Sequence, residues 1–387
     1  MPVPCELCGR EALAFAYAPE RSNRGISVHI CGVCGLVQSE PRADRAKRAP
    51  AAASSGADWG NVRYGKGFRT QIALDALLRH IDSPSFSLLD VGSNRGSFIN
   101  AVRGSRPDAA ITAVEPDERV AQSVAGLAEL IVSRIEDAAL PADRFDVVHS
   151  CHTIEHVAHP LAVLRDHHRV LKDGGLLILD APNIALIGAD DVVEEWFIDK
   201  HLTHFSERTL TRMVEAAGFT IVRQPDPTDR ENLFLVARKA AQVQAPIAAD
   251  PPQVDHAYEL ISSYVAARSH NTEALTSVAA ELTGLASRGI AIWGAGRIFD
   301  SLIVYGKFDP KLLSVLVDKH LAAHVAERHG CRLSGPDALS HAKPGVIVVM
   351  SRGFAREIAA EAKSKAPAAE ILLFTDLLGR ARLRLAA

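Results

Sequence analysis

The segment Leu88–Phe98 constrains the fold more than any other part of this 387-residue chain. An apolar run ends in Gly92, Gly96 follows four residues later, and a helix-like segment begins beyond it. Glycine has no Cβ, so the backbone can turn sharply there and a ligand can lie against it. Free N–H groups at the start of the helix would face that ligand. The segment therefore predicts a strand, a tight turn and a helix, with a ligand site at the turn.

Apolar runs and helix-like segments continue to alternate after this turn. The runs lie at 87–91, 110–114, 145–150 and 176–181, and a helix is predicted over 208–217, closed by Gly218. Strands that alternate with helices imply a parallel sheet covered on both faces, as in doubly wound Rossmann-like folds. Further runs at 289–293, 313–317, 346–350 and 370–374 predict a second, smaller Rossmann-like α/β domain.

The chain divides into three blocks joined by two tethers, and its length also favours two or three domains. Five ranges follow: a cysteine-paired lobe over 1–40, a linker over 41–58, the first α/β domain over 59–239, a linker over 240–256, and the second α/β domain over 257–387. The two linkers are rich in Ala and Pro, which suits flexible tethers. A helix-like stretch begins at His256.

The overall composition excludes several classes of protein. Hydrophobic content of 48% and charged content of 23% are those of a soluble globular chain. A net charge of -3 gives no electrostatic case for a nucleic-acid polymer or a membrane surface. No apolar run approaches the length of about 18 residues that a membrane span needs. We expect a cytoplasmic protein, and nothing in the sequence indicates an oligomeric state.

Two acidic positions after the glycine turn suggest what its ligand is. Glu115 ends the next predicted strand, where a carboxylate can accept hydrogen bonds from both hydroxyls of a ribose. Ile135 and Glu136 precede the strand after that, where they can supply an apolar wall and a polar partner to an adenine. The glycine turn alone could be purely structural, but the three features in this order predict an adenosyl ligand. The turn lacks the spacing of dinucleotide binders and the Lys-Ser/Thr pair of a P-loop.

The N-terminal cysteines form two matched pairs. Cys5 and Cys8 make one Cys-x-x-Cys turn, Cys31 and Cys34 make another, and 22 residues separate them. Two such turns can complete a tetrahedral four-thiolate site, with the gap closed by a hairpin. A site with four protein ligands has no open position, so we expect structural zinc. Two disulfides or redox thiols are the alternative.

The segment 90–96 resembles motif I of class I S-adenosylmethionine-dependent methyltransferases. Residues 145–157 resemble the motif at their fourth strand, and 164–175 resemble the helix and Lys-x-Gly-Gly turn before their fifth. The resemblance implies S-adenosylmethionine as the cofactor. It implies a set of cofactor-binding residues: Asp90, Gly92, Ser93, Asn94, Gly96, Glu115, Pro116, Ile135, Glu136, His152 and Thr153. It also implies that Tyr64 covers the cofactor, although Tyr64 could equally be a core residue.

The three-block layout resembles the sugar C-methyltransferases that act on nucleotide-linked keto-deoxysugars. That resemblance implies a zinc lobe, a cofactor domain and a C-terminal domain that helps to hold a nucleotide-sugar, so the expected partner is a small-molecule acceptor. It also implies a base that removes a proton next to a ketone, for which His201 is the candidate. The base cluster departs from the family, because Ile198 stands where Tyr is expected and Lys200 where Glu is expected.

These departures leave the acceptor atom open. The segment that contains His201 also matches O- and N-methyltransferases, in which this histidine has a packing or capping role. Four further residues are fallback acid-base groups: His152, Glu155, His156 and His204. A non-catalytic nucleotide-sugar-binding protein is a third possibility.

The last block contains a second glycine turn, Gly294-Ala295-Gly296, and Asp318 follows its next predicted strand. These features alone could bind NAD. Phe299 occupies the place of the third fingerprint glycine, so a nucleotide-sugar diphosphate, or no ligand, fits the turn better.

Overall fold

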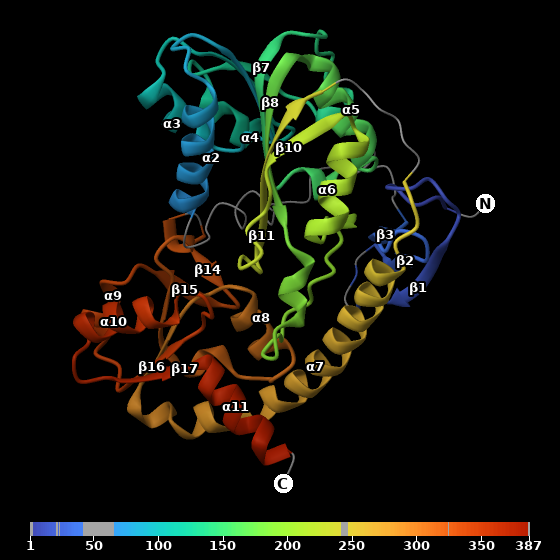
Figure 1. The fold of residues 1–387 in the computed structure, drawn as a ribbon. Coiled ribbons are helices and arrows are strands. Elements are labelled where there is room, and N and C mark those ends of the chain that lie inside the picture. The colour runs from blue at the N-terminus through green and yellow to red at the C-terminus, as the bar shows by residue number, and fades with distance from the viewer. Residues whose placement is uncertain are drawn as a thin grey trace. The chain divides into compact units, whose positions relative to one another are not determined.

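The computed structural model describes residues 3–20, 22, 24–41, 66–240, 247–323 and 325–385. They fall into two compact units (Figure 1): one takes in the described residues of 1–49, 67–187 and 196–261, and the other those of 50–66, 188–195 and 262–387. The three-block layout remains a prediction, because nearly all of the first expected linker and part of the second lie outside the described residues.

The central sheet of the first unit contains the predicted strands. Its order is β10-β11-β8-β7-β4-β5-β6. The bounds are β4 (Ser87–Val91), β5 (Ala110–Val114), β6 (Glu129–Ile131), β7 (Phe145–Cys151), β8 (Leu171–Pro182), β10 (Phe219–Arg223) and β11 (Asn232–Lys239). Five strands are parallel, but β11 runs antiparallel to both of its neighbours, so the sheet is mixed where a parallel one was expected.

Helices cover both faces of this sheet (Figure 1). Helices α2 (Lys66–His80) and α3 (Ser97–Ser105) pack on one face, and α5 (Pro160–Val170) and α6 (Glu207–Ala216) pack on the other. Neighbouring residues of a strand therefore enter different cores, as Leu88 and Leu89 of β4 do. The short α4 (Glu118–Ala121) follows β5.

The predicted helix over 208–217 is confirmed as α6, and local sequence explains both of its ends. Ser206 caps its N-terminus by accepting from the Thr209 N–H, and the Thr209 hydroxyl in turn accepts from the Ser206 N–H. Gly218 follows its C-terminus with a φ of 99°, a value that disfavours residues with a Cβ.

The chain reverses its direction across the sheet at β4. Strands β5 and β6 extend the sheet on one side of β4, and β7 and β8 extend it on the other. Ligands of open α/β sheets bind beyond the carboxyl ends of the strands at such a switch point. The Gly92 turn after β4 and the segment after β7 meet there.

The cysteine lobe has a sheet of its own, in the order β1-β2-β3-β9. Strands β1 (Leu13–Tyr17) and β2 (Ser27–Cys31) form the hairpin expected between the cysteine pairs, and β3 (Val37–Glu40) follows. The fourth strand, β9 (Thr203–His204), comes from far along the chain and pairs with β3. This pairing joins the lobe to the segment that contains His201.

The second unit contains a six-stranded sheet in the order β14-β15-β13-β12-β16-β17. Its strands are β12 (Ile290–Trp293), β13 (Leu313–Val317), β14 (Glu327–Arg328), β15 (Cys331–Ser334), β16 (Val346–Val349) and β17 (Glu370–Leu373). Its helices are α8 (Arg297–Val304), α9 (Ala338–Ala342), α10 (Ala355–Lys365) and α11 (Phe374–Leu385). The four predicted strands are confirmed to within one residue at each end.

One predicted boundary was wrong. Helix α7 (Pro251–Gly284) begins five residues before His256. Proline suits the first turn of a helix, where its missing N–H has no helical partner anyway, so the two prolines that suggested a tether begin the helix instead.

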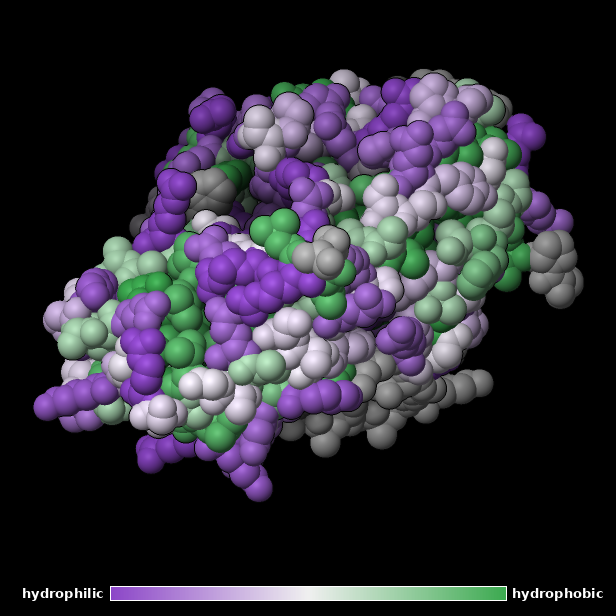
Figure 2. Space-filling model, turned by 90° about the horizontal axis from the view of Figure 1, so that it is seen from below, coloured by the Kyte–Doolittle hydropathy of each residue, from purple (hydrophilic) through white to green (hydrophobic). Residues whose placement is uncertain are grey.

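Apolar and polar residues are interspersed on the face shown in Figure 2. Scattered exposed apolar side chains, such as Phe15 and Leu383, are ordinary on a protein surface. Among the described residues, no helix combines the length and the apolar character that crossing a membrane requires.

Candidate functional site

The turn after β4 has the conformation for which its glycines are suited. Gly92 and Gly96 have φ angles of 69° and 73°. A Cβ on Gly92 would lie 2.1 Å from the Thr153 hydroxyl oxygen, so no larger residue fits without displacing Thr153. The Gly92 N–H is fixed by the carbonyl of Val114 at 2.8 Å. The turn therefore presents bare backbone at the switch point.

Glu115 lies beside this turn, as predicted. One of its carboxylate oxygens accepts from the Asn94 N–H at 2.9 Å, and the other accepts from the Asp117 N–H at 3.0 Å. Burial raises the pKa of Glu115 above its ordinary value. Each carboxylate oxygen has further acceptor capacity, which suits a ribose with two hydroxyls.

An orphaned polar atom supports a ligand at the turn. The buried hydroxyl of Ser93 has no hydrogen-bond partner among the described residues. Such atoms are rare in folded proteins unless a ligand or water satisfies them. The bare glycines, the fixed carboxylate and this hydroxyl fit S-adenosylmethionine. Pro116 is exposed next to Glu115.

Asp90 lies beneath the turn, inside β4. Its carboxylate is 2.6 Å from Nδ1 of His149 on β7, and the His149 ring stacks on Phe98 with centroids 3.8 Å apart. Its second oxygen, Oδ2, is buried with no hydrogen-bond partner in the described part of the chain. Asp90 therefore joins the two strands that flank the switch point.

Of the two residues predicted to contact adenine, Ile135 and Glu136, only the apolar one lies as the prediction requires. Ile135 is buried beside the core, and Glu136 forms an ion pair with Arg134. A polar contact from Glu136 to adenine would have to share its carboxylate with that arginine. Tyr64 lies outside the described residues.

Three histidines gather around Glu155, in the turn after β7. Glu155 is 1% exposed, and neither of its oxygens has a hydrogen-bond partner among the described residues. Burial raises its pKa to about 8. One oxygen lies 3.6 Å from Nδ1 of His152 and 3.5 Å from Nε2 of His156. His152 has a φ of 50°, an unusual value that turns its side chain toward this cluster.

His201 belongs to the same group. Its ring centroid is 4.9 Å from that of His156, and its ligating atom lies within 4.8 Å of those of His156 and Glu155. Nδ1 of His156 is 2.8 Å from the Lys200 carbonyl, so that nitrogen carries a proton and Nε2 faces Glu155. We call Glu155, His152, His156 and His201 the acid-base cluster.

His204 lies apart from the cluster. It is 3% exposed, its Nε2 lies 2.9 Å from the Ser39 hydroxyl oxygen, and its ring packs edge-on against Phe197 at 4.8 Å. The structure therefore brings together four of the five predicted acid-base residues.

Sequence reasoning missed Asp180 and Arg69. Asp180, near the end of β8, is 4% exposed and lies 3.9 Å from Nε2 of His152 and 3.8 Å from Nε of Arg69. Burial raises its pKa above the ordinary value. Asp180 could have been found from the sequence, because it is an acidic residue near the carboxyl end of an apolar strand. Nothing in the sequence singles out Arg69, which comes from α2.

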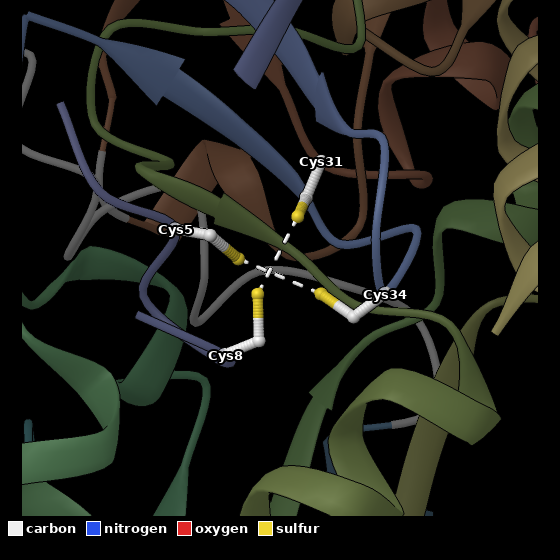
Figure 3. Close-up of side chains that lie close together, drawn as sticks. All are labelled: Cys5, Cys8, Cys31 and Cys34. Carbon is white, nitrogen blue, oxygen red and sulfur yellow. Dashed lines mark hydrogen bonds between the residues drawn. The ribbon is translucent and has the colours of Figure 1, made fainter. Parts of the chain in front are cut away.

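The four N-terminal cysteines converge as predicted (Figure 3). Sγ of Cys5 lies 3.5 Å from that of Cys34, and Sγ of Cys8 lies 3.6 Å from that of Cys31. Zinc–sulfur bonds of about 2.3 Å at tetrahedral angles would place the sulfurs about 3.8 Å apart, so the arrangement fits zinc. All six cysteines of the chain are free thiols, which disfavours the disulfide alternative.

The glycine turn of the second unit has a structural explanation. Gly294 has a φ of 114°, and a Cβ there would lie 2.8 Å from the Met350 carbonyl oxygen. The Asp318 carboxylate accepts from the N–H groups of Ala295, His320 and Leu321. Because three backbone donors already occupy Asp318, this site offers little to a dinucleotide ribose.

Comparison with known proteins finds a family that resembles part of the first unit. Residues 44–224 match the family described as a methyltransferase domain. This part of the chain is therefore similar to methyltransferase domains.

Two of the relatives found are ubiquinone biosynthesis O-methyltransferases. The one from Methylobacterium nodulans is 29% identical over 180 residues, which cover 41% of this chain and 66% of that protein. The one from Cereibacter sphaeroides is 40% identical over 110 residues, which cover 25% of this chain and 41% of that protein. The chain thus spans less than two thirds of the length of either relative.

Solved structures resemble the chain in part. A 1,6-didemethyltoxoflavin-N1-methyltransferase from Burkholderia thailandensis is 19% identical, with a TM-score of 0.39, over 58% of this chain and 100% of that one. A putative S-adenosylmethionine-dependent methyltransferase from Listeria monocytogenes is 17% identical, with a TM-score of 0.36, over 46% of this chain and 100% of that one.

Proposed function

We propose that the chain is an S-adenosylmethionine-dependent methyltransferase that methylates a hydroxyl oxygen of a small molecule. One observation carries the proposal. The bare turn at Gly92 and the fixed carboxylate of Glu115 lie at the switch point, and the acid-base cluster lies close by, because β7 pairs with β4 and the turn after β7 carries Glu155. The turn and Glu115 would hold the adenosyl and methionine parts, and the cluster would face the acceptor.

S-adenosylmethionine, when bound, supplies an electrophilic methyl group, and its transfer to a hydroxyl forms a carbon–oxygen bond, breaks a carbon–sulfur bond and releases one proton. The acid-base cluster would take that proton. A general base works best with a pKa near the working pH, and burial brings the pKa of Glu155 to about 8. His152 and His156 flank its carboxylate, and His201 adjoins His156, so the proton can be shared among them.

Two observations favour oxygen over carbon as the acceptor atom. The relatives found are named O-methyltransferases. In addition, Ile198 and Lys200 replace the Tyr and Glu expected of a base cluster that deprotonates a sugar carbon. A hydroxyl is easier to deprotonate than a carbon next to a ketone, so the remaining histidines and Glu155 would suffice.

Carbon methylation of a nucleotide-linked keto-deoxysugar is the second candidate. The lobe with the four thiols favours this candidate, because the resemblance to sugar C-methyltransferases implies such a lobe. In addition, His201 lies beside Glu155, and His201 is the base that the resemblance implies.

We also propose that the four thiolates of Cys5, Cys8, Cys31 and Cys34 hold one structural zinc ion. With four protein ligands, such a site leaves no open position for chemistry. The ion would stabilise the two turns that flank the β1–β2 hairpin.

Transfer of a labelled methyl group to two acceptors tests the proposal. The purified chain is incubated with methyl-labelled S-adenosylmethionine and either a catechol, 3,4-dihydroxybenzoate, or a nucleotide-linked keto-deoxysugar. Label in the catechol that is lost on ether cleavage supports O-methylation. Label in the sugar that survives ether cleavage supports the second candidate. Binding of S-adenosylhomocysteine without label in any acceptor would instead indicate a non-catalytic binding protein.

A further inference from the structure

The segment that contains His201 has little structure of its own. Residues 195–202 form neither helix nor strand, and β9, which follows, has only two residues. A catalytic side chain on such a segment needs outside support, because a displacement of about 1 Å can cost about 100-fold in rate. The contacts that supply this support come from two directions.

The first set of contacts comes from the cysteine lobe. Strand β3 pairs with β9, with Val37 opposite His204, and the Ser39 N–H donates to the Leu202 carbonyl at 3.0 Å. The Ser39 hydroxyl oxygen lies 2.9 Å from Nε2 of His204, and both side chains are buried. The lobe thus fixes the backbone immediately after His201.

The lobe also holds the backbone two residues before His201, at Asp199. Arg24 donates from Nη1 to the Asp199 carbonyl at 2.9 Å, and the Ser22 hydroxyl bonds to the Asp199 carboxylate. The Tyr17 and Phe197 rings lie 5.6 Å apart. His201 therefore lies between two lobe anchors, one at Asp199 and one at Leu202.

The second set of contacts joins the same backbone to the acid-base cluster. The Leu202 N–H donates to the Glu155 carbonyl at 2.7 Å, and the Lys200 carbonyl lies 2.8 Å from Nδ1 of His156. Leu202 thus connects the lobe to the acid-base cluster, because its carbonyl accepts from the Ser39 N–H and its own N–H donates to the Glu155 carbonyl. Any shift of β3 would move His201 relative to His156 and Glu155.

We propose that the cysteine lobe completes the acceptor site, with Ser39 and Arg24 acting as positioning residues that hold His201 against Glu155 and His156. The proposal rests on the proposed function, because it gives the lobe a part in methyl transfer. Strand β3 begins three residues after Cys34, so the four-thiol centre supports the strand that carries Ser39. The lobe then positions a catalytic side chain as well as stabilising the fold.

Deleting the lobe would not test this role. Cys5, Leu7 and Leu36 belong to the same buried core as Phe205 and Leu210, so the deletion would expose that core. Replacing Arg24 and Ser39 with alanine removes the side-chain contacts to the Asp199 carbonyl and to His204. The backbone bond from Ser39 to Leu202 and the apolar packing stay in place. Arg10 supplies a matched control, because it is an exposed arginine of the same lobe outside these contacts.

The test compares the parent chain, the double variant Arg24→Ala/Ser39→Ala and Arg10→Ala, all at full length. Zinc content and S-adenosylhomocysteine binding are measured first and should match in all three. His201 is then acylated with diethyl pyrocarbonate, and its modification rate is read from peptide masses. The double variant should be modified about fivefold faster, as expected for the net loss of one hydrogen bond.

Turnover gives the second readout. With 3,4-dihydroxybenzoate, the double variant should lose at least about 10-fold in kcat with little change in KM for S-adenosylmethionine. Arg24→Lys/Ser39→Ala, which keeps a donor for the Asp199 carbonyl, should recover part of the loss. Unchanged His201 modification in the double variant would overturn the proposal. If the parent shows no turnover, the proposed function fails, while the modification rates still decide whether the lobe positions His201.

Discussion

Asn94 donates its backbone N–H to the Glu115 carboxylate at 2.9 Å, and this bond links the turn after β4 to the end of β5. The Asp117 N–H holds the other oxygen, so the carboxylate is aimed before any ligand arrives. Such preorganisation lowers the cost of binding, because few groups need to be ordered. Glu115 is therefore the side chain on which cofactor affinity should depend most.

Replacing Glu115 with glutamine should weaken S-adenosylhomocysteine binding. Glutamine keeps the shape, but its NH2 group must face either a backbone N–H or a ribose hydroxyl. We expect a loss of about 10- to 100-fold in affinity, or about 1.4 to 2.8 kcal/mol, measured by isothermal calorimetry. Glu118→Gln, an exposed neighbour in α4, is the control. Equal affinities for both variants would remove Glu115 from the cofactor site.

Glu155 should make the stability of the fold depend on pH. Burial raises its pKa from 4.5 to about 8. Between these values the folded chain keeps a proton that the unfolded chain has released, so the free energy of unfolding falls as the pH rises. In Glu155→Gln this dependence is absent. The stability of the variant relative to the parent should grow from pH 4.5 to 8 by about 2 kcal/mol or more, and then level off.

Urea unfolding across that pH range measures this difference. Glu215→Gln, an exposed position on α6, should show a constant offset from the parent. If the free energy of unfolding of Glu155→Gln changed with pH in parallel with that of the parent, Glu155 would be ionised in the folded chain at neutral pH.

The four-cysteine site should bind one zinc ion per chain. Cys31→Ser should abolish the bound zinc and lower the melting temperature, because metal binding at such sites contributes directly to folding. Elemental analysis and thermal unfolding measure the two effects. Cys331→Ser, in the second unit, should keep the zinc. A zinc-free parent chain with the same melting temperature as Cys31→Ser would contradict the zinc proposal.

Asp180 should affect the acceptor more than the cofactor. Its buried carboxylate lies 3.9 Å from His152, and its Oδ1 has no hydrogen-bond partner among the described residues. Asp180→Asn should lower kcat/KM for the catechol by at least about 10-fold, with S-adenosylhomocysteine affinity unchanged. The exposed Asp173→Asn is the control. Equal kinetics for both variants would assign Asp180 a purely structural role.

Local patterns in the sequence predicted much of this site. The strand at 87–91, the glycines after it and Glu115 depend on neighbouring residues, and the structure places them as expected. The four cysteines were predictable because Cys-x-x-Cys spacing already fixes each half of the site. The roles of these residues in binding remain predictions.

Long-range pairing could not be predicted. Strand β9 has two residues, too few for a hydrophobic pattern, and it exists because β3 offers an open edge. The inward placement of His204 follows from that pairing. Arg69 reaches Asp180 only because α2 packs over the sheet. The antiparallel β11 likewise depends on how the chain returns to the sheet.

Calorimetry with S-adenosylhomocysteine shows whether the turn after β4 binds the cofactor. The parent chain should bind one molecule per chain. Gly92→Arg should bind none while its circular dichroism remains that of the parent, because a side chain at Gly92 would collide with Thr153 and fill the turn. A parent chain that binds no S-adenosylhomocysteine, or a Gly92→Arg variant that binds it as well as the parent does, would mean that this turn is not a cofactor site.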